Sequence, residues 1–179
     1  MVMAALVNFL FAAFAYLLPF SNQLFENESA YATMLTLGAV GSISAAAISS
    51  RVKSSIYHLL FNLLLSGLGV AIIGWAFFLP NFAWIFYVGN LGTEFFMTIF
   101  NIHFLSQIQM RVPNELMGRV FSVVFTIAIA LMPLGTWFIS HFPNAIHLLT
   151  FTGLGLGVMV LAILGMLYNC LKGFEKSNL

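Results

Sequence analysis

Six stretches of this sequence are apolar and long enough to cross a lipid bilayer as helices. They cover approximately residues 1–20, 31–50, 56–79, 82–107, 120–140 and 145–171. A hydrocarbon core about 30 Å thick requires about 20 helical residues. Only 6% of the residues are charged, against about a quarter in average soluble domains. The sequence therefore predicts an all-α membrane protein, with one six-helix transmembrane domain over residues 1–171 and a short cytoplasmic tail over residues 172–179.

The positions of the basic residues predict the orientation in the membrane. All six lie after the second, fourth or sixth stretch or beside those loops: Arg51, Lys53, Arg111, Arg119, Lys172 and Lys176. The first loop on the opposite side carries Glu26 and Glu28, and the loops of that side contain no Lys or Arg. Basic loops favour the cytoplasmic side, so both termini are predicted to be cytoplasmic. No basic patch suited to nucleic acid is present.

Glu94 is the one charged residue inside the long apolar stretches. A charge at mid-membrane costs about 2.5 kcal/mol or more, so this side chain must face protein or water. Helical spacing places Asn90, Glu94, Thr98 and Asn101 within roughly 80° of one another, on one polar stripe. The candidate residues for a proton or substrate pathway are therefore Glu94, Asn90, Thr98, Asn101, Tyr87 at the outer end of the stripe, and Asn8 in the first stretch. The alternative for Glu94 is a protonated carboxyl that hydrogen-bonds a facing helix.

Small residues and prolines predict how the helices pack and where they end. Gly38, Ser42, Ala46 and Ser49 form a small-residue stripe in the second stretch, which allows a neighbouring helix to approach closely. The GxxxG spacing of residues 153 and 157 favours packing inside the bundle over a dedicated dimer interface. Further signals come from proline: we expect a kink at Pro133 and helix boundaries at Pro80, Pro113 and Pro143.

Known catalytic and metal-binding patterns do not occur in the sequence. It has no GxSxG elbow, no HExxH pair and no phosphate loop. The four histidines are scattered, and none has a second ligand one helical turn away. We therefore expect neither an enzyme, nor a metal site, nor a bound cofactor.

The segment after the fourth stretch resembles a known family. Residues 109–122, QMRVPNELMGRVFS, are similar to the Q-x-x-V-P-x-E-x-x-G-R-V-x-S stretch between the tenth and eleventh helices of the major facilitator superfamily, especially its drug and macrolide efflux branch. The cytoplasmic residues that carry the resemblance are Arg111, Pro113, Glu115, Gly118 and Arg119, together with Arg51 and Lys53 after the second stretch. Ser50 stands where many members place an Asp.

The resemblance covers the whole chain as the C-terminal half of such a transporter, helices seven to twelve. It implies that the first, second, fourth and fifth spans line or flank a central cavity, while the third and sixth lie peripherally. The implied activity is secondary transport, as proton-coupled efflux of hydrophobic or drug-like compounds by alternating access. The implied location is the bacterial cytoplasmic membrane, as a multi-pass protein.

The partners that this reading implies are the lipid bilayer, protons, a small-molecule substrate, and an N-terminal six-helix half or a second copy of the chain. The sequence leaves open whether the chain is a fragment or a complete half-size protein. Two further alternatives remain. The chain could be a non-transporting membrane subunit or scaffold, or an inactive truncated remnant of a transporter.

Overall fold

The computed structural model describes residues 2–79, 84–142 and 145–177, and this part of the chain is helical without strands. The long helices are α1 (Val2–Leu17), α3 (Ala30–Ile48), α4 (Ile56–Trp75), α5 (Trp84–Gln109), α6 (Asn114–Ala130), α7 (Met132–Ser140) and α8 (Leu148–Ser177). Short helical turns extend three of them: η1 (Leu18–Phe20) with α2 (Ser21–Leu24), η2 (Ser49–Arg51) and η3 (Ala76–Phe78). The predicted all-α class is confirmed.

Within the described residues, five helical segments are long and apolar enough to cross a membrane: Val2–Leu24, Ala30–Arg51, Ile56–Trp75, Asn114–Ser140 and Leu148–Lys172. Helix α5 has 26 residues, about 39 Å of helix, and is therefore long enough as well. Its polar side chains make it less apolar than the other five. Helix α5 packs between α3 and α4, which cover part of its polar surface. The helices are those of an integral membrane protein.

Several helix boundaries differ from the predicted ones. Helix α6 begins at Asn114, directly after Pro113, so residues 114–119 are helical rather than part of a loop. Glu115 in its first turn complements the positive end of the helix dipole. Helix α8 continues to Ser177, so most of the predicted tail is helical. The boundaries expected at residues 80 and 143 lie outside the described residues.

The fifth span is interrupted where a kink was expected. Helix α6 ends at Ala130, and α7 begins at Met132 with Pro133 in its first turn. Proline has no N–H to donate and cannot continue the hydrogen-bond ladder of a helix. The backbone of α7 lies directly on α1, because a Cβ at Gly135 would collide with the carbonyl oxygen of Phe9.

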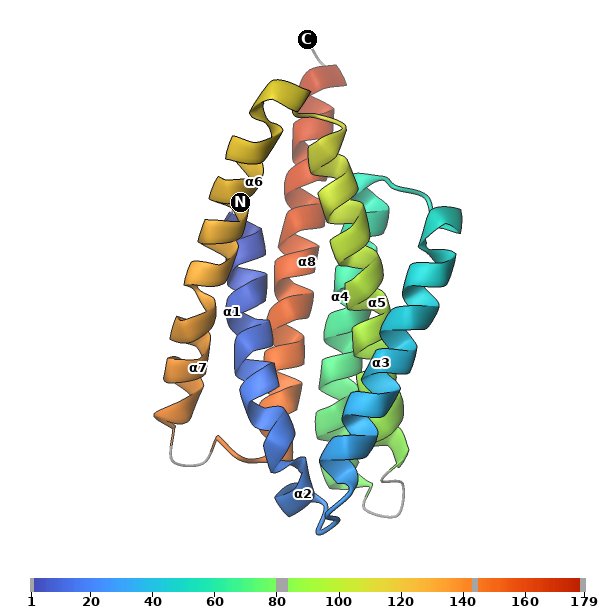
Figure 1. Ribbon diagram of the computed structural model, residues 1–179, viewed down its shortest axis with the longest axis vertical. Helices are drawn as coiled ribbons and strands as arrows, with labels where there is room; N and C mark the ends of the chain where they lie inside the picture. The colour runs from blue at the N-terminus through green and yellow to red at the C-terminus, as the bar shows by residue number, and fades with distance from the viewer. Residues whose placement is uncertain (1, 80–83, 143–144, 178–179) are drawn as a thin grey trace.

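The helices lie side by side in the order α3, α5, α4, α8, α1 and then α6 with α7 (Figure 1). We can exchange each of the first three spans with the span three later in the chain: α1 with α5, α3 with α6 and α7, and α4 with α8. Every span then keeps the same kind of neighbours, because the result is the same row read from its other end. Spans three apart in the chain run in opposite directions. The chain therefore has the neighbour pattern of an inverted three-helix repeat.

Two hydrophobic clusters show where the bundle is closed. The first draws buried side chains from every span, including Phe14, Met34, Phe86, Ile139 and Phe151. The second, toward the other end of the bundle, contains residues of α1, α4, α5 and α8 but none of α3 or α6. The end of the bundle near the first cluster is thus held by all spans. Toward the basic loops, α6 contributes no residue to the second cluster, whereas α3 stays joined to α5 through Ala45, which is buried, and through the contact of His103 with Ser49.

Glycines also allow α4 and α8 to approach each other closely. A Cβ at Gly155 of α8 would lie 2.5 Å from the carbonyl oxygen of Gly67 and 2.8 Å from the Cα of Ala71. The glycines of the GxxxG spacing do not make this contact: a Cβ at Gly153 would meet nothing within 4 Å, and one at Gly157 only Leu10 of α1. The close packing was therefore assigned to the wrong glycines.

Aromatic side chains mark the two ends of the apolar zone. All three tryptophans are exposed at the end opposite the basic loops, where α4 ends at Trp75, α5 begins at Trp84 and α7 contains Trp137. Exposed Tyr57 and Tyr168 lie toward the basic end. Such residues are enriched at membrane interfaces. Tyr57 and Trp75 are 18 positions apart on α4, a rise of about 27 Å, which matches a hydrocarbon core of about 30 Å.

The orientation is a prediction that Cys170, the single cysteine, can test. It is exposed in the last third of α8, between Tyr168 and Lys172, which contact each other. A membrane-impermeant maleimide should label Cys170 in inside-out vesicles and leave it unlabelled in intact cells. Cys170→Ser is the control that should give no signal from either side. Labelling in intact cells alone would reverse the predicted orientation.

Candidate functional site

The polar stripe of α5 is divided among different neighbours, and Asn90 lies at its most buried point. Only 2% of Asn90 is exposed, and its Nδ2 donates a hydrogen bond of 2.8 Å to the carbonyl oxygen of Met34 in α3. Its buried Oδ1 has no protein partner. Asn90 therefore joins α5 to α3 and is not open to a pathway.

Glu94, one turn further along, also faces α3 but is only half-buried. Its Oε2 accepts a hydrogen bond from the Ser42 Oγ across 3.4 Å, which is long for two oxygens. Gly38 makes room for this contact, because a Cβ there would lie 3.1 Å from Cγ of Glu94. The small-residue stripe of α3 thus allows α5 to approach closely, as predicted, and the helix that approaches brings Glu94 with it. One long hydrogen bond leaves this carboxyl with capacity for a proton or water.

Asn101 and Asn8, two further candidates, line one cavity. This cavity of about 270 Å³ lies between α1, α5 and α6. Its remaining lining is apolar, with the aromatic rings of Phe100 and Phe125, and no charged side chain lines it. The Nδ2 of Asn8 donates to the carbonyl oxygen of Ala4 in its own helix. The two carboxamides therefore provide polar atoms in a small, apolar, partly aromatic site.

The last two pathway candidates lie apart from each other. Thr98 is half-buried and lies one turn from Glu94 toward Asn101. Tyr87 packs against the first hydrophobic cluster, with its ring edge toward Phe86 at a centroid distance of 5.7 Å. The structure thus places Tyr87 at the closed end of the bundle, Asn90 and Glu94 on α3, and Asn101 with Asn8 in the cavity.

One polar contact of α5 was missed in the sequence. Thr93 is fully buried against α4, where Ser66 donates a hydrogen bond of 3.1 Å to its carbonyl oxygen. The Thr93 hydroxyl bonds Gly89 in its own helix at 2.9 Å. The signal was present in α4, where Asn62, Ser66 and Gly69 recur at helical spacing. Thr93 itself points about 100° away from Glu94 and so lies off the stripe.

The basic end of α5 is bonded to the segment that joins α3 to α4. Gln107 donates through Nε2 to the carbonyl oxygen of Ser54 at 2.8 Å, and Arg111 donates to the Gln107 Oε1 at 3.1 Å. His103 is buried, and its Nε2 lies 3.2 Å from the carbonyl oxygen of Ser49. These contacts tie the two basic connections of the chain together.

The other residues that carry the family resemblance are exposed: Arg51, Lys53, Pro113, Glu115, Gly118 and Arg119. A Cβ at Gly118 would meet nothing within 4 Å, so packing inside the chain does not require glycine there. Arg111 is linked to the loop that carries Lys53 through two hydrogen bonds, Arg111 to Gln107 and Gln107 to Ser54. Arg119 lies on the surface of α6.

Over the residues that the structure describes, no group of three or more His, Cys, Asp or Glu side chains could hold a metal ion. No family model, curated protein or solved structure matches this chain. The functional interpretation therefore depends on the geometry of the bundle and its cavities.

Proposed function

We propose that the chain is one half of a secondary transporter of the major facilitator type, which exports hydrophobic, drug-like compounds in exchange for protons. The observation that carries the proposal is the cavity that Asn8 and Asn101 line, in a bundle held together at the tryptophan end. Toward the basic end, the second cluster lacks α3 and α6. A half-bundle with this shape supports access to a substrate from one side at a time.

The inverted neighbour pattern of the helices supports the same proposal. Three-helix inverted repeats occur within each half of such transporters, whose two halves surround a central site. In this arrangement α4 and α8 occupy the middle of the row and contact each other, with α5 and α3 on one side of them and α1, α6 and α7 on the other. The second half would be a further six-helix unit or a second copy of the chain.

In the proposal Glu94 carries the coupling proton, while Asn8 and Asn101 contact the substrate. Glu94 and Asn101 are seven residues apart on α5, about 10 Å along the helix. The lining of the cavity is uncharged, which suits neutral or weakly polar compounds. Glu94 and Asn101 both belong to α5, so a change in the packing of α5 on α3 would also move the cavity residues of α5.

Replacing Asn101 tests the proposed substrate site. Asn101→Ala is expected to weaken binding of a hydrophobic fluorescent dye about threefold to tenfold, because one hydrogen bond is lost. Inverted membrane vesicles should accumulate the dye only while a pH gradient is maintained, and more slowly with this variant. The matched control is Asn62→Ala, because Asn62 lies outside the cavity and bonds His58 of its own helix at 2.7 Å.

Equal dye binding by the two variants would contradict the proposed cavity. Dye binding with no dependence of accumulation on the gradient would contradict proton coupling.

A non-transporting membrane subunit is the second candidate function. It is favoured by the hydrogen bonds that Asn90 and Glu94 make inside the chain, and it predicts neither dye binding nor accumulation.

A further inference from the structure

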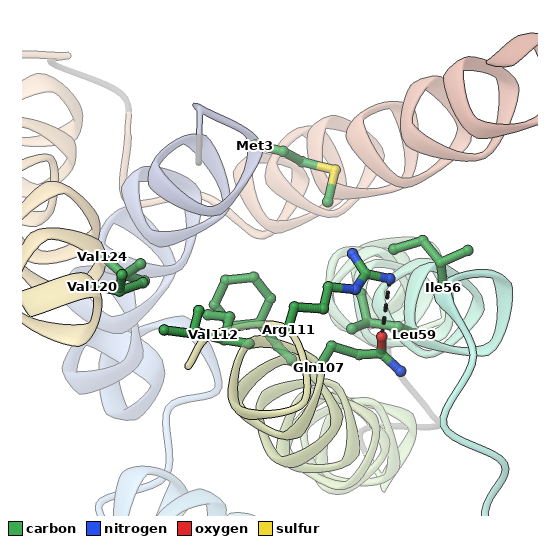
Figure 2. Close-up of a pocket in the computed structure, with 10 residues that line it drawn as sticks. Met3, Ile56, Leu59, Gln107, Arg111, Val112, Val120 and Val124 are labelled. Atoms are coloured by element: carbon green, nitrogen blue, oxygen red, sulfur yellow. Dashed lines mark hydrogen bonds between the residues drawn. The ribbon is translucent and has the colours of Figure 1, made fainter. Parts of the chain in front are cut away.

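A second cavity lies at the basic end of the bundle, where α1, α4, α5 and α6 diverge (Figure 2). Its volume is about 310 Å³, within the range of ligand pockets, about 300–1,000 Å³. The lining is almost entirely apolar and includes Met3, Ile56, Leu59, Val112 and Val120. An occupant must therefore place a hydrocarbon part among these side chains.

Arg111 is the one charged residue in the lining of this cavity. Its guanidinium is oriented by the hydrogen bond to Gln107 (Figure 2). Gln107 is itself held by the carbonyl oxygen of Ser54. A guanidinium has five N–H donors, and the protein uses one of them here. The others are available to an anion, for which the paired N–H groups of arginine are suited.

The depth of the cavity matches the membrane interface. Ile56 in its lining directly precedes the exposed Tyr57, which marks the basic end of the apolar zone. Arg51 and Lys53 lie on the connection just before α4, and both are exposed. Anionic lipids attract basic groups at this depth, and basic pockets between helices bind their head groups.

We propose that this cavity binds one anionic phospholipid, with its phosphate on Arg111 and part of an acyl chain among the apolar residues. A soluble anion would leave the hydrocarbon lining without a partner, and a zwitterionic lipid would bring no net negative charge to Arg111. The proposal does not depend on transport. Phe104 and Val124 line this cavity and the Asn8–Asn101 cavity, so the acyl chain would lie against the proposed substrate site.

Native mass spectrometry of the full chain tests this site, after extraction from vesicles of equimolar phosphatidylglycerol and phosphatidylcholine. The wild-type chain should retain phosphatidylglycerol about fivefold over phosphatidylcholine, the effect of one basic residue near the surface. Arg111→Gln should bring the ratio close to one. Arg119→Gln removes the same charge outside the cavity and should keep the preference.

A second variant tests the apolar part of the site. Val120→Phe fills the cavity from α6 without changing any charge, and it should also reduce the preference for phosphatidylglycerol. Circular dichroism confirms that each variant keeps its helices. Equal losses from Arg111→Gln and Arg119→Gln would overturn the proposal in favour of diffuse charge attraction. Displacement of the lipid by inorganic phosphate would show a soluble-anion site, and absence of any preference would refute the site altogether.

Discussion

Gly155→Ala is expected to destabilise the protein by about 2 kcal/mol or more, an overpacking effect at the upper part of the usual range. The added methyl group would lie 2.5 Å from the carbonyl oxygen of Gly67 and 2.8 Å from the Cα of Ala71. Both atoms belong to the backbone of α4, which cannot move aside as a flexible side chain would. Helices α4 and α8 must therefore separate, and the second hydrophobic cluster loses contacts between them.

Gly153→Ala, two residues earlier on the same helix, is the matched control. A methyl group there meets nothing within 4 Å, so the variant should gain up to about 1 kcal/mol from the higher helix propensity of alanine. Unfolding in mixed detergent micelles, followed by circular dichroism, gives both values. Similar stabilities for the two variants would show that α4 and α8 do not touch at Gly155.

Glu94→Gln is expected to reduce gradient-driven accumulation of dye to the level of vesicles without the protein. Glutamine has nearly the same size as glutamate and still accepts a hydrogen bond from Ser42 above Gly38, so the packing of α5 on α3 remains. It cannot take up and release a proton. Dye binding should stay within about threefold of the wild-type value, because the cavity lining does not include residue 94.

Glu28→Gln removes an equal charge from the exposed connection between α2 and α3 and should leave accumulation unchanged. Full gradient-driven accumulation by Glu94→Gln would end the assignment of the coupling proton to Glu94. Loss of dye binding together with accumulation would instead show that Glu94 holds the shape of the cavity.

The helices were predictable because each span is a continuous apolar segment of sufficient length. The residues at which the helices begin and end were harder to predict. Apolarity marks the part of a helix inside a membrane, whereas a helix continues through polar residues as long as its backbone bonds are made. Residues 114–119 and the end of α8 both contain charged residues, and both are helical. Pro113 was the reliable signal, because proline limits where a helix can begin.

The polar stripe of α5 was predictable from helical angles alone, but the neighbour of each side chain was not. Asn90 and Glu94 turn out to face α3, whereas Asn101 meets Asn8 across a cavity. These pairings depend on how three helices cross, which a periodic pattern within one helix cannot specify. For the same reason Gly155, rather than Gly153, makes the close approach to α4. Membrane orientation, transport and the roles of the site residues stay predictions.

The interruption at Leu131 divides the fifth span into two parts that are held very differently. Helix α7 lies directly on the α1 backbone at Gly135, whereas α6 buries only Val124 and Ala128. The hydrogen-bond ladder is already broken between the two parts, so a change in the tilt of α6 requires no helix to unwind. It requires only that a few side-chain contacts be exchanged. The two parts of the fifth span are therefore attached by different means, α7 by backbone contact with α1 and α6 by two buried side chains.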